Sequence, residues 1–282
     1  MKDNRSNKAI EQDQTWDQFV RNISSETSFD DQWEFFETNF ADRPEADGPP
    51  VVWSPNSQTD HTNLARFMKQ FGVSDYTSMH RLSCSDRDGF WKAVVDHLGI
   101  QFATESNSVL HNSTDPKNPT WFPGATMNIS DSCFSAPSER PAVVTRKEGS
   151  TELETTTYGQ LEELVNRVAK GLKDHGFESG DRIALYVPMT LECVVAYLGI
   201  IRAGCCAVSI ADSFSSEELG KRLDLAEAKG LITVDTQTRA RKKIPMYSKG
   251  VEVGAPRTVV IPEGSVLSDA LREGDLTWQQ LV

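Results

Sequence analysis

The stretch from Thr156 to Asp235 constrains the fold most, because helix and strand patterns alternate along it without interruption. Apolar residues at helical spacing open it, and Gly176 and Gly180 then break the chain. Three short apolar runs follow, and each predicts a buried strand: Ile183–Val187, Cys205–Ile210 and Leu231–Val234. Strands joined through helices pair in parallel with right-handed crossovers. The stretch therefore predicts an α/β fold with an incomplete, mainly parallel βαβαβ sheet.

The helices of this stretch have recognisable starts and ends. The first has one apolar face and a capping box made by Thr157 and Gln160; the face consists of Leu161, Leu164, Val165, Val168, Ala169 and Leu172. A second helix is predicted over Leu191–Arg202, before Gly204. A third is expected to begin at a capping box of Ser215 and Glu218 and to run to Lys229, where Gly230 stops it.

The apolar stretch from Ile183 to Ala211 also raises the possibility of a membrane span. Pro188, Glu192 and Arg202 interrupt it, and a lone spanning helix would bury two charges at roughly 3 kcal/mol each. We therefore expect the βαβ arrangement and no membrane span.

Composition limits the classes of partner. The 282 residues are 38% hydrophobic and 25% charged, which permits a packed core, and the net charge is −12. That charge argues against nucleic acid or an anionic membrane as a partner held by overall electrostatics. The histidines and the five cysteines lack metal-ligand spacing, so no metal site is predicted, and the cysteines are interpreted as buried free thiols of a reducing compartment: Cys84, Cys133, Cys193, Cys205 and Cys206.

Three regions are predicted along the chain. Residues 1–50 form a polar, acidic arm and linker, residues 51–140 an N-terminal helical region, and residues 141–282 the α/β part. Within the arm, Met1–Gln14 is expected to be disordered, aromatic residues between Thr15 and Phe40 predict one or two amphipathic helices, and Ala41–Pro50 is expected to be a linker.

The middle region contains two further helical patterns and an extended segment. One pattern runs from Leu64 to Phe71, and the other from Phe90 to Leu98 with Asp86 as its N-cap. Two prolines exclude Asp115–Gly124 from a helix or a central strand, and a hairpin of Ala142–Thr145 with Thr155–Thr157 is expected to precede the first long helix.

A dense basic cluster follows the third strand, with four cations in five residues at Arg239-Ala240-Arg241-Lys242-Lys243. It comes at the carboxyl end of a parallel strand, the edge at which open α/β sheets bind ligands. One interpretation is a site for an anionic ligand such as a phosphate or nucleotide. The other is a solvated loop, which composition alone favours because most charge runs are exposed.

Several segments resemble a known family. TYGQLEELVNRVAKGL, GDRIALYVPMTLECVVAYLGIIRAG and FSSEELGKRLDLAEAKGLITVD resemble the front half of the adenylating domain of AMP-forming acyl-CoA ligases. NPTWFPGATMNISDSCF resembles the signature that precedes that domain in the acetyl-CoA and acetoacetyl-CoA synthetase branch. GVSDYTSMHRLSCSDRDGFWKAVVDHLGI and SIADSFSSEEL are most similar to plant acyl-activating enzymes assigned to peroxisomes. The resemblance spans roughly Val51 to Val260. It implies that residues 51–140 are a synthetase N-terminal region and that residues 141–282 are the first part of an adenylate-forming (AMP-binding) domain, truncated before the phosphate loop.

The resemblance also shows two departures. Asp212 and Ser213 stand where acetyl-CoA synthetases carry a glycine pair before Phe214, near the thiol end of CoA. The Gly-rich loop that wraps the ATP phosphates in the family is absent from these residues, as is the C-terminal domain with its catalytic lysine. Attack of a carboxylate on the α-phosphorus needs such donors and Mg²⁺, so no catalytic residue is assigned and this N-terminal part is expected to be inactive by itself.

The resemblance favours CoA as the ligand of the basic cluster. Arg239 and Lys242 match the pair of positions that contacts the phosphorylated adenosine end of CoA in acetyl-CoA synthetases, and Ala240 and Arg241 lie between them. Arginine can form a two-pronged contact with phosphate and lysine cannot, so Lys242 is expected to be the weaker contact.

Two functions remain open from the sequence. One is the N-terminal part of an ATP-dependent ligase that converts a carboxylic acid, ATP and CoA to acyl-CoA, AMP and pyrophosphate. The alternative is a stand-alone, non-catalytic module that binds CoA or a protein partner. The resemblance implies a peroxisomal location, and the absence of a recognisable targeting signal leaves a cytoplasmic one as the other expectation.

Overall fold

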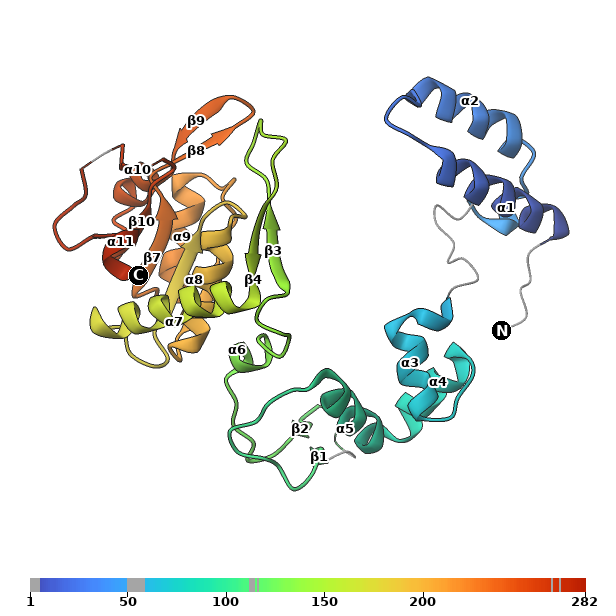
Figure 1. The fold of residues 1–282 in the computed structure, drawn as a ribbon, viewed down its shortest axis with the longest axis horizontal. Helices are drawn as coiled ribbons and strands as arrows, with labels where there is room; N and C mark the ends of the chain where they lie inside the picture. The colour runs from blue at the N-terminus through green and yellow to red at the C-terminus, as the bar shows by residue number, and fades with distance from the viewer. Residues whose placement is uncertain (1–5, 50–58, 112–114, 116, 265, 269) are drawn as a thin grey trace. The chain divides into compact units, whose positions relative to one another are not determined.

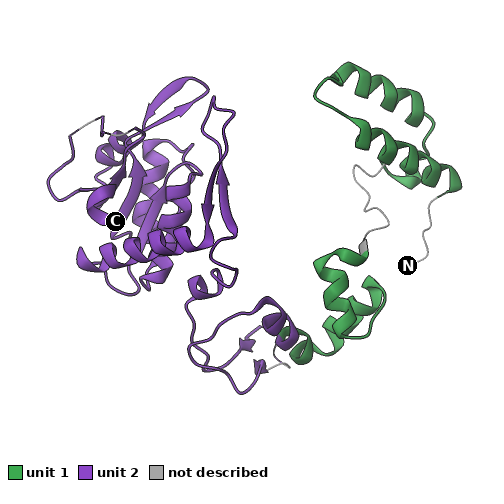
Figure 2. Cartoon of the chain, in the orientation of Figure 1, with its two compact units in different colours: residues 1–91 green, residues 92–282 purple. Residues whose placement is uncertain are grey.

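A computed structural model describes residues 6–49, 59–111, 115, 117–264, 266–268 and 270–282 (Figure 1). The chain forms two compact units, residues 1–91 and 92–282, coloured separately in Figure 2. The boundary lies inside helix α5 (Arg87–Leu98). The boundary predicted between residues 50 and 51 lies outside the described residues.

The first unit is helical, as predicted. Helices α1 (Asn7–Asn22) and α2 (Phe29–Phe40) pair through aromatic contacts, and two short 3₁₀ turns follow at Glu45–Asp47 and Thr59–His61. Helix α3 (Asn63–Gln70) contacts α5 through the rings of Phe67 and Phe90, 5.9 Å apart. Helix α4 (Tyr76–Ser85) was not predicted; Asp75 caps it by accepting from the Ser78 amide. Asp86 caps α5 as expected, accepting from the Gly89 amide.

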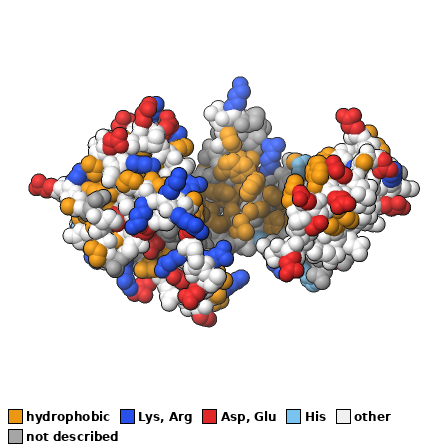
Figure 3. Space-filling model, turned by 90° about the horizontal axis from the view of Figure 1, so that it is seen from above, with side chains coloured by type: hydrophobic (Ala, Val, Ile, Leu, Met, Phe, Trp, Pro, Cys, Tyr) orange, Lys and Arg blue, Asp and Glu red, His pale blue; other side chains and the backbone are white. Residues whose placement is uncertain are grey.

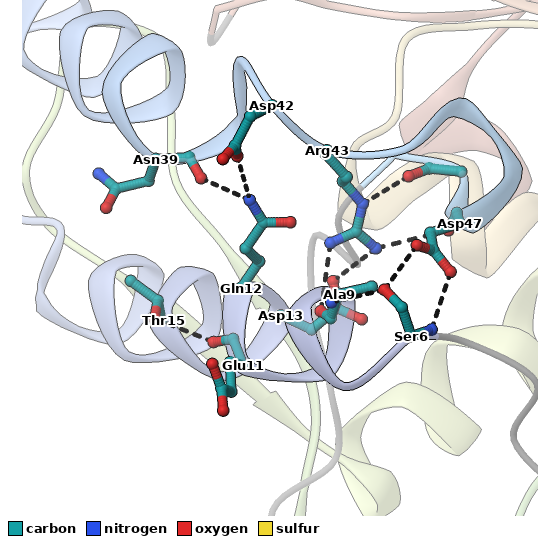
Figure 4. Close-up of polar contacts among 11 residues, drawn as sticks. Ser6, Ala9, Glu11, Gln12, Asp13, Thr15, Asn39, Asp42, Arg43 and Asp47 are labelled. Atoms are coloured by element: carbon teal, nitrogen blue, oxygen red, sulfur yellow. Dashed lines mark hydrogen bonds and ion pairs between the residues drawn. The ribbon is translucent and has the colours of Figure 1, made fainter.

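The expected disorder up to Gln14 is wrong from Asn7 onward, and the expected linker at 41–49 is folded onto α1 (Figure 4). Ser6 caps α1, and the amide of Gln12 bonds the carbonyl of Asn39 at 2.8 Å. The buried guanidinium of Arg43 lies 3.0 Å from the Asp13 carboxylate and donates to the carbonyl oxygen of Gly48 at 2.6 Å. Several polar residues that suggest disorder in isolation find tertiary partners here, and these contacts order the segment.

The second unit begins with small elements that lead to the sheet. Strands β1 (Leu110–His111) and β2 (Thr120–Trp121) pair antiparallel, and α6 (Ile129–Ser132) contacts the end of helix α8 (Leu191–Arg202), where Arg202 donates to the Ser130 hydroxyl at 2.8 Å. The predicted hairpin is present as β3 (Pro141–Thr145) and β4 (Glu154–Thr157).

The predicted α/β fold is confirmed by a five-stranded parallel sheet in the order β11-β10-β7-β5-β6. Its strands are β5 (Arg182–Tyr186), β6 (Cys206–Ser209), β7 (Gly230–Val234), β10 (Thr258–Ile261) and β11 (Leu276–Thr277). Every residue of β7 and β10 is buried, because helices cover both faces.

The covering helices form two layers. Helices α7 (Tyr158–Asp174), α8 and α11 (Trp278–Leu281) pack together, and α9 (Ser216–Ala226) packs with α10 (Met246–Glu252). Helix α7 has the predicted capping box and apolar face. A Cβ on Gly199 of α8 would lie 2.5 Å from a methyl carbon of Val168, so this glycine lets α7 and α8 approach closely.

Several details differ from the sequence predictions. Strand β6 is half-exposed rather than buried because it lies at the edge of the sheet. Helix α9 ends at Ala226, before Lys229, and Gly230 already belongs to β7. Ser215 caps α9, but the capping box is incomplete because the Glu218 carboxylate pairs with Arg222 instead. Among the cysteines, only Cys205 is buried and Cys193 half-buried; the thiols of Cys84, Cys133 and Cys206 are exposed, and all five are free.

Candidate ligand site at the carboxyl edge of the sheet

The sheet changes direction at β5. The chain goes from β5 to β6 on one side and returns to β7 on the other side of β5. In open α/β sheets, ligands bind outside the carboxyl ends of the strands next to such a change. The carboxyl end of β7 is Val234, and Asp235 connects it to an antiparallel hairpin that projects from this edge (Figure 1).

The basic cluster forms that hairpin and not a loop. Strands β8 (Thr236–Arg239) and β9 (Lys242–Pro245) are joined by Ala240 and Arg241, whose φ angles are +49° and +65°. Two consecutive residues of positive φ form the tight turn that suits the twist of a hairpin. The sequence did not reveal the turn because non-glycine residues adopt this conformation at a cost of roughly 1 kcal/mol each.

The hairpin sorts its cations onto two faces. Arg239 pairs directly with Lys242, and Thr238 pairs with Lys243. Directly paired residues lie on the same face, and neighbours along a strand alternate between faces. Arg239 and Lys242 therefore share a face with Gln237, while Lys243 lies on the other face with Thr238. All five residues from Arg239 to Lys243 are exposed, and Figure 3 views the end of the unit that carries the hairpin, where Lys and Arg side chains are frequent.

Asp235 fixes the base of the hairpin. Its buried carboxylate accepts from the backbone amides of Thr236, Glu263 and Ser268, at 2.6, 2.7 and 3.0 Å, and from the Ser268 hydroxyl at 3.0 Å. Burial alone would raise the pKa of Asp235, but these hydrogen bonds outweigh it and lower the pKa below the ordinary value. A charged, fully bonded carboxylate thus ties β8 to the segment after β10.

Glu263 holds one face of the hairpin. Its carboxylate accepts from the Thr236 hydroxyl at 2.9 Å and from the Thr238 amide at 2.5 Å. The hydrogen bonds from Thr238 lower the pKa of Glu263 most, burial opposes them, and the bond from Thr236 and the positive charge of Lys243 lower it further. Lys243 lies on the same face of the hairpin as Thr236, whose hydroxyl binds this carboxylate.

The opposite face is connected to the segment that follows β6. The side-chain amide of Gln237 donates to Asp212 at 2.8 Å. This hydrogen bond places Asp212 at the base of the face that carries Arg239 and Lys242.

A half-buried network fixes the segment that follows β6. The Tyr186 hydroxyl at the end of β5 donates to the carbonyl of Phe214 at 2.6 Å and accepts from the Lys249 ammonium at 3.1 Å. Lys249 also donates to the Phe214 carbonyl at 3.1 Å, and the Arg222 guanidinium lies 4.0 Å over the Phe214 ring. Sequence analysis missed Asp235, Glu263 and this network, because their residues come from separate elements and no local spacing signals them.

Among the described residues, no helix is long and apolar enough to cross a membrane. Within the same ranges, no three His, Cys, Asp or Glu side chains are grouped as metal ligands would be.

The sequence pattern of the AMP-binding enzymes matches residues 130–279, more than half of the chain, and that of the acetyl-coenzyme A synthetase N-terminus matches residues 76–133. A probable peroxisomal acyl-activating enzyme 18 from Arabidopsis thaliana is 36% identical over 257 residues, which cover 83% of this chain and 35% of the relative. Hexanoyl-CoA synthase from Cannabis sativa is 33% identical over 254 residues, covering 82% and 35%.

The fold matches a solved structure as well. Acetoacetyl-CoA synthetase from Streptomyces lividans superposes with a TM-score of 0.74 at 27% identity, over 83% of this chain and 38% of that one. The chain spans about a third of the length of the curated relatives it matches. Taken with the parallel sheet and its carboxyl-edge hairpin, these matches show that the chain belongs to the AMP-binding enzyme family of AMP-forming acyl-CoA ligases.

Proposed function

We propose that this chain is the N-terminal part of an ATP-dependent acyl-CoA ligase. The complete enzyme would convert a carboxylic acid, ATP and CoA to acyl-CoA, AMP and pyrophosphate. The family match, the acetyl-CoA synthetase N-terminal match and the shared fold support this proposal. The same proposal includes a peroxisomal location, because two relatives carry that word in their names, and a fluorescent fusion of the complete protein would test it.

The role proposed for this chain is to bind CoA through the hairpin. The observation that carries it is the direct pairing of Arg239 with Lys242, which places two exposed cations on one face of a hairpin fixed at its base. Ala240 and Arg241 form the turn beside them and complete the proposed site. A phosphate could accept a two-pronged hydrogen bond from Arg239 and a single one from Lys242.

The test compares three alanine variants in the complete enzyme. Arg239→Ala is expected to raise the Michaelis constant for CoA by about 10- to 100-fold, because one charge-assisted hydrogen bond contributes roughly 1.5–3 kcal/mol. Lys242→Ala should raise it less. Acyl-adenylate formation, measured by pyrophosphate exchange, should stay nearly unchanged, because these side chains would hold a phosphate far from the reacting thiol.

Lys243→Ala is the matched control. It removes the same charge from the same hairpin, but from the face beside Glu263. The Michaelis constant for CoA should therefore change little. Equal effects of the Arg239 and Lys243 variants would indicate general electrostatic attraction. An unchanged constant in Arg239→Ala would leave the hairpin as a solvated surface feature and refute the proposed role.

Adenylate formation is proposed to need further sequence. ATP and Mg²⁺ would bind as co-substrates of the complete enzyme, and the Gly-rich phosphate loop that the family uses is absent from the 282 residues. The cations of the hairpin serve a different ligand in this proposal, so they would not replace that loop.

The alternative function is a non-catalytic module that binds CoA or a protein. It predicts that the 282-residue chain binds CoA without any contribution from other sequence. Isothermal titration of this chain with CoA distinguishes the two, since the ligase proposal expects part of the CoA site to come from outside these residues.

A further inference from the structure

The N-terminal hairpin, defined as residues 6–49, is held together by its own contacts. The Trp16 ring lies 5.5 Å from that of Phe40, and Phe19 stacks on Phe35 at 3.8 Å. The buried pair of Arg43 and Asp13 closes its ends (Figure 4). These contacts come from α1, from the part of α2 after its first turn and from the 41–49 segment.

Two aromatic rings in the first half of α2 remain exposed. Phe29 is 72% exposed and Trp33 is 50% exposed, and their rings stack with centroids 6.3 Å apart. The Trp33 ring also stacks on Phe36 at 5.5 Å, which connects the exposed pair to the hairpin core. Large rings that are already positioned lose little entropy on binding, and such rings supply most of the binding energy at protein interfaces.

Acidic side chains flank these rings. Asp30, Glu34 and Glu37 follow Phe29 and Trp33 around the helix surface, and all three are exposed. Among the described residues, none of the three forms an ion pair. The hairpin contains eleven acidic residues and three basic ones, and the basic ones are already paired: Lys8 with Asp42, Arg21 with Asp17, and Arg43 with Asp13.

A shallow depression on α2 shares Glu34 with this surface and otherwise lies on the opposite side of the helix from Phe29 and Trp33. It has a volume of about 280 Å³ and is lined by Asp31, Glu34, Phe35, Thr38 and Asn39. Its lining combines one aromatic ring with acidic and amide groups. A lysine or arginine side chain has the matching character, since its stem is apolar and its end is cationic.

We propose that the exposed half of α2 binds a basic amphipathic helix of a partner protein. Phe29 and Trp33 would receive the apolar face of that helix, and Asp30, Glu34 and Glu37 would receive its Lys or Arg residues, the usual arrangement for a helix bound on an apolar surface. A second copy would bring the same acidic surface against itself, and an anionic membrane would be repelled. The surface lies outside the segments matched by the two family patterns.

The test uses the full 282-residue chain and two labelled peptides of ~18 residues, long enough to form a helix. Both have the same leucine face; one carries lysine and the other glutamate on its polar face. Fluorescence anisotropy should show binding of the lysine peptide alone, weakening as salt rises from about 50 mM to about 500 mM. A Phe29→Ala/Trp33→Ala variant should bind at least ~10-fold more weakly.

Charge is tested separately. Asp30→Asn/Glu34→Gln/Glu37→Gln should weaken binding roughly 5-fold, because three attractive pairs are lost. The control Glu148→Gln/Glu152→Gln/Glu273→Gln changes the net charge equally at exposed positions elsewhere, and Tyr76→Ala removes another exposed ring, 66% accessible. Neither control should alter binding. The helical circular dichroism of every variant should match that of the wild type, since only exposed side chains change.

Several results would overturn the proposal. Equal binding of both peptides would show that hydrophobic contact alone acts, and equal loss in the control variants would show that net charge alone acts. Self-association that the Phe29→Ala/Trp33→Ala variant abolishes would identify a second copy as the occupant. Binding to vesicles rich in phosphatidylserine, lost in the same variant, would identify a lipid surface.

Discussion

Arg43 shows how one side chain can order a segment whose composition is typical of a linker. Its side chain is 5% exposed, and its guanidinium pairs with Asp13 and donates to the carbonyl oxygens of Gly48 and Ala9. Planar, permanently charged guanidinium groups suit such buried contacts because several fixed donors are satisfied at once. The partners of Arg43 lie up to 34 residues away, and they determine the conformation of 41–49.

We expect Arg43→Ala to destabilise the N-terminal hairpin by about 3 kcal/mol, because Asp13 would be left as a buried charge without its partner. Hydrogen exchange of the α1 amides should accelerate by roughly 100-fold. Lys8→Ala is the matched control, since Lys8 also joins α1 to the 41–49 segment through an exposed pair with Asp42. Its exchange should change little; comparable acceleration in both variants would contradict a special role for the buried pair.

At the scale of elements, the β8–β9 hairpin depends on contacts beyond its two strands. A two-stranded hairpin is marginally stable in water, and this one has two non-glycine residues at positive φ in its turn. Three other segments hold it: Asp235 binds the base, Glu263 binds β8 on one face, and Asp212 binds Gln237 on the other. These contacts fix the direction in which Arg239 and Lys242 point.

Asp235→Asn is expected to lower the stability of the second unit by about 2 kcal/mol at pH 7, because a neutral amide cannot accept the four hydrogen bonds of the carboxylate. The pKa of Asp235 is lowered in the folded state, so its contribution is present above the ordinary value of 3.8 and is lost as pH falls through the lowered pKa. The difference between wild type and variant should therefore shrink in acid.

Urea unfolding followed by circular dichroism at pH 7 and at about pH 3 measures this difference. Asp224→Asn, at an exposed position of α9, makes the same chemical change without removing such a network. If the difference in unfolding free energy between wild type and Asp235→Asn is the same at both pH values, Asp235 stabilises the unit by its shape and not by its charge.

At the scale of the whole molecule, each of the two units contains one of the two proposed binding sites. The second unit contains the parallel sheet and the hairpin proposed for CoA, and the first contains the surface proposed for a basic partner helix. The matched segment covers 35% of each of the two relatives.

A polypeptide of residues 1–282, expressed alone, is expected to form neither acyl-adenylate nor acyl-CoA. Loss of one preorganised donor typically costs about 10²–10³ in rate, and here the entire family phosphate loop is missing from the sequence. Pyrophosphate release with ATP, Mg²⁺ and a panel of short and medium carboxylic acids measures the activity. Acid-dependent release above a no-protein control, retained through further purification, would mean that another group in these residues binds the phosphates.

The sequence by itself determined the sheet helices and the position of the basic cluster. Their signals are local: apolar spacing predicted α7 and α8, and Thr157 with Gln160 predicted the capping box. Only the tertiary structure decided that α1 and residues 41–49 are ordered and that β6 is half-exposed. It also decided on which face of the β8–β9 hairpin each cation lies. These depend on groups far apart in the chain, such as Asp13 with Arg43 and Asp235 with Glu263, whose burial and charge pairing arise only after the elements have packed.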